Sequence, residues 1–324
     1  MDAIEAGEDV VLTADIQLNS QIPVTNSVVI DLGGHTVTSS VTTALFDVNG
    51  TILKLKGQGT LNVAGRIANV RNGGTIIIED GTYSSSRAEV VRVMDGTAIV
   101  NGGDLTGREG AVTCREGGST VEINGGHLVG TDNFAVATNG STNMGGNTVT
   151  INDGVLEGNI TTSGYEAIGV YIANSDTVVI NGGQIIAHGG TGLCMRAGDV
   201  TINGGTITAT NVDKNGNVVP DGKVGDDKRV MEGCSAVIFD EESNYPGQGE
   251  MTMKLTINGG TITGVDHSVQ VLSNAAEPAV EIKGGTLTPE PDQIFDSNAD
   301  GDDELIFDAN PDGETPENIY DGND

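Results

Sequence analysis

One short phrase recurs along most of this 324-residue chain: an apolar strand, then Asn-Gly-Gly or a close copy, then a second apolar pair. Successive copies lie 22 to 29 residues apart, with one interval of 55, as their second glycines show: Gly34, Gly59, Gly81, Gly103, Gly126, Gly154, Gly183, Gly205, Gly260 and Gly285. A unit of roughly 22 residues is too short for helical repeats, which need about 33 to 45, and it is typical of a short solenoid.

Each repeat holds three strand-like runs. Val200–Ile202 precedes a turn, Thr206–Thr208 follows it, and Ala111–Cys114 exemplifies the third run. The runs alternate with period two, Val, Ile and Thr dominate them, and Gly or Asn marks the corners, all of which favour strands. Three strands per turn, stacked about 4.8 Å apart, predict an all-β parallel β-helix of about ten rungs, roughly 45–50 Å long.

The asparagine of the phrase has a structural explanation. Equivalent side chains would stack at one corner of successive rungs, each amide bonding to the next, while the following glycine permits a left-handed backbone. We therefore predict a structural asparagine ladder of Asn101, Asn124, Asn152, Asn181, Asn203 and Asn258.

The repeat divides the chain into three parts. Residues 1–27 are expected to be an N-terminal cap and entry segment, and residues 28–288 the β-helix, with inserted loops at about 211–250. Residues 289–324 form an acidic C-terminal tail, because no Lys or Arg occurs beyond Lys283. Loops that leave a rigid scaffold often carry function.

The opening AGEDVVLTADIQLNSQIPVTNSVVIDLGGHTV and the later NGGxI turns resemble right-handed, pectin-lyase-like β-helix proteins over about residues 10–288. The resemblance implies a right-handed solenoid but not one activity, since the fold carries lyases, hydrolases, adhesins and phage spikes. The Asn-Thr-Asp, Asp-Asp, Gly-His-Gly and Arg-x-Lys set of pectin hydrolases is not in place, since Asp226 and Asp227 lie in the inserted loop without companions. The resemblance thus favours a non-enzymatic member.

Charge narrows the choice of partner. The net charge is −31 with only 15 Lys and Arg, so nucleic-acid phosphates would be repelled. No apolar run approaches the ~18–20 residues of a membrane span, so membrane insertion is not expected. Residues 1–5 lack the basic and apolar regions of a signal peptide; either a leader was removed, or the chain is made in the cytoplasm.

The tail carries one acidic pattern twice. Asp and Asn at positions one, three and five with Gly at six open an EF-hand-type calcium loop. The residues are Asp296, Asn298 and Asp300, then Asp308, Asn310 and Asp312. Position twelve is Phe307 or Ile319 instead of the expected Glu, so the alternative is an acidic, turn-rich tail. The sequence predicts no required cofactor, and calcium is the one ion that these motifs suggest.

Arginines concentrate in the early rungs. Arg92 and Arg115 occupy comparable third-strand positions, so they would lie on one face. That face would suit an acidic glycan or a partner; alternatively, the arginines are solvated charges paired with Glu89, Glu109 and Glu116. The chain has no Trp, five Tyr and five Phe, which disfavours aromatic sugar platforms but leaves polar glycan binding open.

Together these features favour a non-enzymatic, structural or adhesive β-helix. The leading hypothesis is a phage virion accessory (a head fibre, capsid decoration or tail appendage) that contacts other virion proteins or host-surface glycans. The alternatives are a bacterial cell-surface adhesin or carbohydrate-binding module outside the cell, and a polysaccharide lyase or hydrolase. A homotrimer is expected by analogy with spike-type β-helices.

Overall fold

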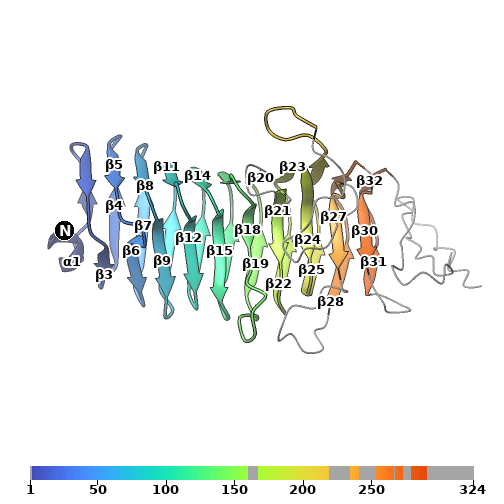
Figure 1. Cartoon of the computed structure of the whole chain (residues 1–324). Helices are drawn as coiled ribbons and strands as arrows, with labels where there is room; N and C mark the ends of the chain where they lie inside the picture. The colour runs from blue at the N-terminus through green and yellow to red at the C-terminus, as the bar shows by residue number, and fades with distance from the viewer. Residues whose placement is uncertain are drawn as a thin grey trace, which may run out of the picture.

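The computed structural model describes residues 2–159, 167–218, 234–240, 253–265, 267–272 and 279–289. They form one stack of strands, which runs from helix α1 (Asp2–Ala6) at the N-terminal end to the last strands at the other (Figure 1). The chain winds as a right-handed parallel β-helix with three strands per rung and about ten rungs, which confirms the fold predicted from the repeat.

Three parallel sheets run the length of the stack, and every described rung except the last gives one strand to each sheet. Sheet A contains β1 (Val10–Val11), β4 (Val28–Asp31), β7 (Ile52–Lys56), β10 (Thr75–Ile78), β13 (Thr97–Val100), β16 (Thr120–Ile123), β19 (Thr148–Ile151), β22 (Thr177–Ile180), β25 (Gly198–Ile202), β28 (Met253–Ile257) and β31 (Val280–Ile282).

Sheet B contains β2 (Ile16–Leu18), β5 (Thr36–Ser39), β8 (Thr60–Val63), β11 (Thr82–Ser85), β14 (Asp104–Gly107), β17 (His127–Gly130), β20 (Val155–Asn159), β23 (Gln184–His188), β26 (Thr206–Thr210), β29 (Thr261–Thr263) and β32 (Thr286–Thr288). Sheet C contains β3 (Ile22–Val24), β6 (Ala44–Asn49), β9 (Arg66–Arg71), β12 (Glu89–Met94), β15 (Gly110–Glu116), β18 (Phe134–Ala137), β21 (Ala167–Ile172), β24 (Gly190–Met195), β27 (Val237–Asp240) and β30 (Val269–Leu272).

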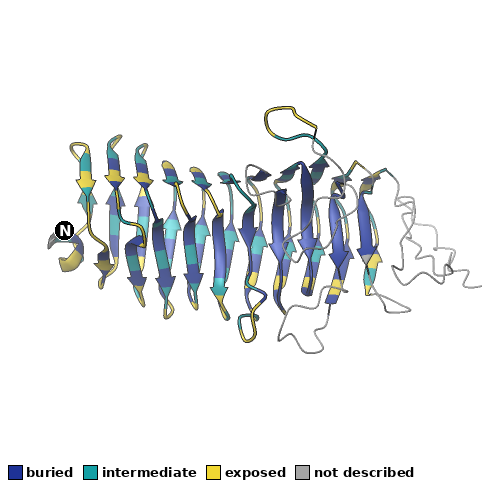
Figure 2. Ribbon diagram, viewed as in Figure 1, coloured by how far each residue is buried: buried dark blue, intermediate teal, exposed yellow. Residues whose placement is uncertain are grey.

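Alternation along each strand fills the interior of the shaft. In β10 the side chains of Ile76 and Ile78 are fully buried, while those of Thr75 and Ile77 are only half-buried. Equivalent residues pair in the next rung, so like side chains stack on like, and one continuous apolar core runs through the shaft. Figure 2 shows buried strands with exposed residues gathered at the turns between them. The alternating sequence pattern therefore determines which side chains point into the core and which point outward.

The corner between sheets A and B carries the asparagine ladder. Each side-chain nitrogen of the ladder donates to the side-chain oxygen of the asparagine one rung closer to the N-terminus, at 2.7 to 3.0 Å. From the C-terminal end, the members are Asn258, Asn203, Asn181, Asn152, Asn124 and Asn101. Asn101 then donates to Glu79 at 3.0 Å, and Glu79 forms an ion pair with Lys54. A one-way row of amide hydrogen bonds thus ends on a carboxylate.

Strands of the shaft begin earlier than the domain boundary that we expected. Residues 1–27, expected to cap the helix, include β1, β2 and β3, which pair with β4, β5 and β6. Among the described residues, helix α1 lies at the end of the stack, next to the first rung (Figure 1). Of the inserted loops at 211–250, the structure describes residues 211–218 and 234–240, and the acidic tail lies outside the described residues from residue 290 onward. No helix among the described residues is long and apolar enough to cross a membrane.

Candidate functional site

The outer surface of sheet C carries a cluster of charged residues on three successive rungs. We define the arginine cluster as Arg66 in β9, Glu89 and Arg92 in β12, and Arg115 in β15. Parallel pairing sets their positions, because β12 lies between β9 and β15 in the sheet. The repeat length therefore brings together side chains that are 23 to 49 residues apart in the chain.

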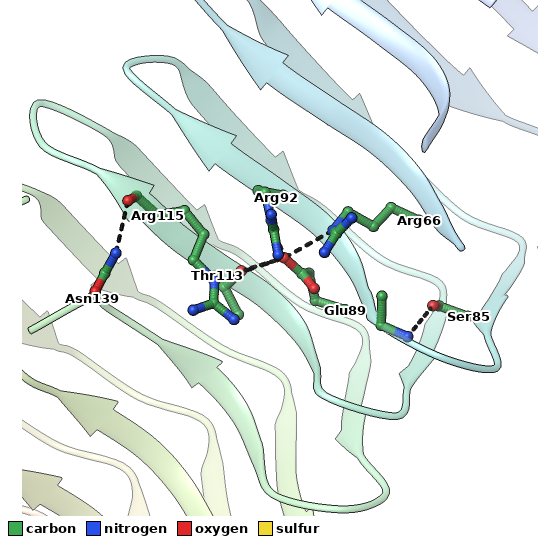
Figure 3. Close-up of polar contacts among 8 residues, drawn as sticks. Arg66, Ser85, Glu89, Arg92, Thr113, Arg115 and Asn139 are labelled. Atoms are coloured by element: carbon green, nitrogen blue, oxygen red, sulfur yellow. Dashed lines mark hydrogen bonds and ion pairs between the residues drawn. The ribbon is translucent and has the colours of Figure 1, made fainter. Parts of the chain in front are cut away.

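Glu89 is the centre of the arginine cluster (Figure 3). Its side chain is 0% exposed, and one carboxylate oxygen, Oε1, lies 3.0 Å from Arg66 Nε and also contacts Arg92 Nε. The Thr113 hydroxyl donates to this oxygen at 3.2 Å, and Arg115 Nε lies 3.9 Å away. The three arginine side chains are 16%, 24% and 37% exposed for Arg66, Arg92 and Arg115. A buried carboxylate therefore holds guanidinium groups that still reach the solvent.

The arginine cluster carries a net positive charge. Burial alone would raise the pKa of Glu89, but hydrogen bonds and charges from Arg92 and Arg66 outweigh it and lower the pKa to about 2. Glu109 lies nearby, and its pKa is raised, first by burial and then by the charge of Glu89. Three arginines thus surround the ionised carboxylate of Glu89, and they outnumber the two carboxyl groups in the region. The cluster keeps a local positive charge on a chain whose net charge is −31.

This arrangement predicts a loss of stability in acid. A carboxyl group whose pKa is lower in the folded than in the unfolded chain stabilises the fold above its unfolded value, and this contribution is lost as the pH falls through the folded value. For Glu89 these values are 4.5 and about 2. We therefore expect the free energy of unfolding to fall by about 3 kcal/mol between pH 5 and pH 2 because of this group. Denaturant unfolding at several pH values would measure it.

The same titration on Glu89→Gln isolates the contribution of Glu89, since all other carboxyl groups stay in place. The variant should lose less stability than the wild type between pH 5 and pH 2, by about the same 3 kcal/mol. Equal losses in the two proteins would mean that Glu89 is not held ionised in the fold.

A shallow polar groove of about 400 Å³ lies beside the cluster, at the adjoining edge of sheet B. Its lining includes the hydroxyls of Ser84, Thr106 and Thr131 and an ion pair in which Arg108 donates to Asp132 at 3.2 Å. Arg108 directly precedes Glu109, whose carboxyl group interacts with Glu89, Arg115 and Arg66, so the groove and the arginine cluster are neighbours at this corner. Hydroxyls and a charged pair on three successive rungs offer both donors and acceptors to a polar ligand.

The sequence singled out part of this site. Arg92 and Arg115 lie on one face of sheet C, and both arginines approach Glu89. Sequence reasoning did not single out Arg66 as a member or place Glu89 at the centre. The available signal was the rung period, because Arg66 and Glu89 are 23 residues apart and therefore occupy the same position in neighbouring rungs.

The structure also brings together two histidines that the sequence did not link, His127 and His188. On the outer surface of sheet B, His127 Nε2 lies 3.3 Å from one oxygen of Glu157, and His188 Nε2 lies 3.5 Å from the other. Asp104 lies 3.9 Å from the second nitrogen of His127. Within the described residues, no group of three or more His, Cys, Asp or Glu side chains is placed to hold a metal ion.

The expected calcium residues cannot be placed. Both acidic motifs fall within residues 290–324, outside the described residues. The calcium sites of Asp296, Asn298, Asp300, Asp308, Asn310 and Asp312 therefore stay a prediction.

The outer surface of sheet C changes character toward the C-terminal end. A second apolar cluster replaces the charged residues there, with Tyr171, Cys194 and Ile238 among its members. The guanidinium of Arg196 lies 5.4 Å from the centre of the Tyr171 ring, and Arg196 Nε lies 3.8 Å from Asp240. In the part of this sheet that the structure describes, the arginine cluster thus lies on the early rungs, whereas Arg196 and Asp240 on the later ones are buried.

Comparison with known proteins gives no match from which a function could be transferred. No protein-family model, no curated protein and no solved structure matches the chain. The structure shows the parallel β-helix fold alone, and function is argued from the residues.

Proposed function

We propose that this protein is a non-enzymatic, adhesive β-helix that binds acidic glycans through the arginine cluster. The single observation that carries the proposal is the buried Glu89, which fixes three partly exposed arginines on a rigid sheet. Carboxylate and sulfate groups of acidic sugars accept the paired N–H groups of a guanidinium well. Preorganised donors also lose little conformational entropy when a ligand binds.

The neighbouring groove supports a glycan over another anion. Its hydroxyl groups and the Arg108–Asp132 pair match the donors and acceptors of sugar hydroxyls. Such a surface binds sugars without aromatic platforms, in keeping with a chain that has no Trp. An acidic sugar at the cluster and a neighbouring unit in the groove would share one continuous polar surface.

Removing the most exposed arginine should weaken binding. Arg115→Gln is expected to reduce the affinity for an acidic oligosaccharide, such as an oligogalacturonate, about tenfold or more, since charged hydrogen bonds contribute roughly 1.5–3 kcal/mol. Calorimetric titration at low salt would measure the affinity, and rising salt should weaken it.

Arg87→Gln is the matched control, because Arg87 is exposed and lies outside the cluster. It should keep the wild-type affinity. Equal losses in Arg87→Gln and Arg115→Gln would reduce the effect to net charge and would contradict the proposal, as would a neutral glycan that binds equally well.

The biological setting is proposed separately. We favour a phage virion accessory that contacts host-surface glycans, with a bacterial cell-surface adhesin or carbohydrate-binding module as the alternative. Mass spectrometry of purified particles and of cell envelopes would separate them. Release of unsaturated or reducing-end products from the bound glycan would instead favour a lyase or hydrolase, and sedimentation analysis would test the expected homotrimer.

A further inference from the structure

The N-terminal end of the shaft contains an apolar cavity of about 170 Å³. Its wall is formed by the first rungs and by α1, and it includes Ile16, Ile30, Leu32, Val37, Phe46 and Leu61. None of the described residues that line it is charged. The cavity lies in the core itself and is separate from the arginine cluster, which occupies the outer surface of sheet C.

The architecture explains why a void occurs here. Within the shaft, buried apolar side chains stack on equivalent residues of the neighbouring rungs and belong to one core cluster; such interiors are generally close-packed. Among the described residues, the first rung has a neighbouring rung on one side only, and Val10, Leu12, Ile16 and Leu18 are only partly buried. Helix α1 lies across this end and inserts Ile4, which is 8% exposed. A helix of five residues is too small to fill the space beneath it.

The lining determines what can enter. An ordered water needs two to four polar partners, so a cavity with aliphatic and aromatic walls stays dry. A dry cavity of about 150 Å³ lined by such side chains takes up benzene or xenon, because an apolar guest restores dispersion contacts that the walls lack. The cavity at this end has similar size and chemistry.

We propose that the N-terminal cavity is a binding site for a small, neutral, apolar molecule of about one aromatic ring or a short alkyl group. Binding buries apolar surface and leaves no polar group of the lining without a partner. Helix α1 forms one wall of the site and is held there by two contacts: the side-chain amide of Asn26 donates to the Glu5 carbonyl at 2.7 Å, and Ile4 packs against the core.

Thermal unfolding of the full chain with and without saturating benzene tests this site. We expect benzene to raise the Tm by about 2 °C or more, since a ligand that binds only the folded state stabilises it. Ala3 lines the cavity from α1, and Ala6 is exposed on the same helix. Ala3→Leu should fill the cavity and lose the benzene response, whereas Ala6→Leu, with the same change in volume, should keep it.

Xenon NMR provides a readout that needs no variant. Xenon should exchange into the wild-type cavity, and benzene should displace it. The proposal is overturned if neither benzene nor xenon interacts with the wild type, or if Ala3→Leu responds to benzene as strongly as Ala6→Leu. Since the cavity does not contain the arginine cluster, such a failure leaves the glycan proposal standing.

Discussion

Glu89→Gln is expected to lower the free energy of unfolding at pH 7 by about 3 kcal/mol. The substitution keeps the size of the side chain but removes its charge, so Arg66 and Arg92 lose the carboxylate that they contact. Breaking a buried ion pair from one side typically costs about 3–5 kcal/mol, and the partial exposure of the arginines places the effect at the lower end. Equilibrium denaturant unfolding would measure the change.

Glu116→Gln is the matched control. Glu116 is the last residue of the neighbouring strand β15 and is exposed, so the same change in charge should alter stability by less than about 0.5 kcal/mol. If Glu89→Gln proved as harmless as Glu116→Gln, Glu89 would not be the organising centre of the arginine cluster.

Gly126→Ala is expected to destabilise the shaft by about 3–5 kcal/mol, combining backbone strain with a steric clash. Gly126 has a φ of +92°, and a Cβ atom there would lie 2.7 Å from the carbonyl oxygen of Gly103. That oxygen accepts the His127 N–H at 2.8 Å, a hydrogen bond that joins adjacent rungs. The added methyl group cannot move away, because the obstacle is backbone rather than a flexible side chain. Thermal or denaturant unfolding would measure the loss.

Gly73→Ala separates the two causes. Gly73 also has a positive φ, of +74°, but a Cβ atom there would meet nothing within 4 Å. It should therefore cost only the strain of a left-handed residue, about 1–2 kcal/mol. Similar losses in the two variants would show that packing between rungs adds little at the Gly126 corner.

The fold could be predicted because the same pattern of strands and turns recurs along the chain. A strand such as Val200–Ile202 is ambiguous alone, but successive copies at one spacing leave few architectures that stack them. The first rung was harder to recognise, since Ile16–Leu18 and Ile22–Val24 lack the glycine phrase that marks the later ones. Pairing with β5 and β6 assigns these strands to the shaft.

The site was less predictable because it depends on register. Arg92 and Arg115 could be placed on one face from their position in the repeat, and Glu89 could be named as one of three acidic residues that pair with them. That Arg66 and Arg115 approach the same oxygen of Glu89 as Arg92 does depends on which residues lie opposite across rungs. The meeting of His127 and His188 at Glu157 is diagonal across three strands, so no simple spacing reveals it. The cavity arises because, among the described residues, the first rung has no neighbouring rung on its outer side. A sequence pattern does not show such a void.

The asparagine ladder gives the shaft an electrical direction. All its amide dipoles point the same way, with donors toward the N-terminal end, where Glu79 accepts the last hydrogen bond. Each member needs only an identical neighbour, so the row has translational symmetry and no preferred length. Removing or duplicating one complete rung, for example residues 182–203, would leave every remaining amide with the same kind of partner. Length is therefore an adjustable property of this molecule, independent of the cross-section that its side chains define.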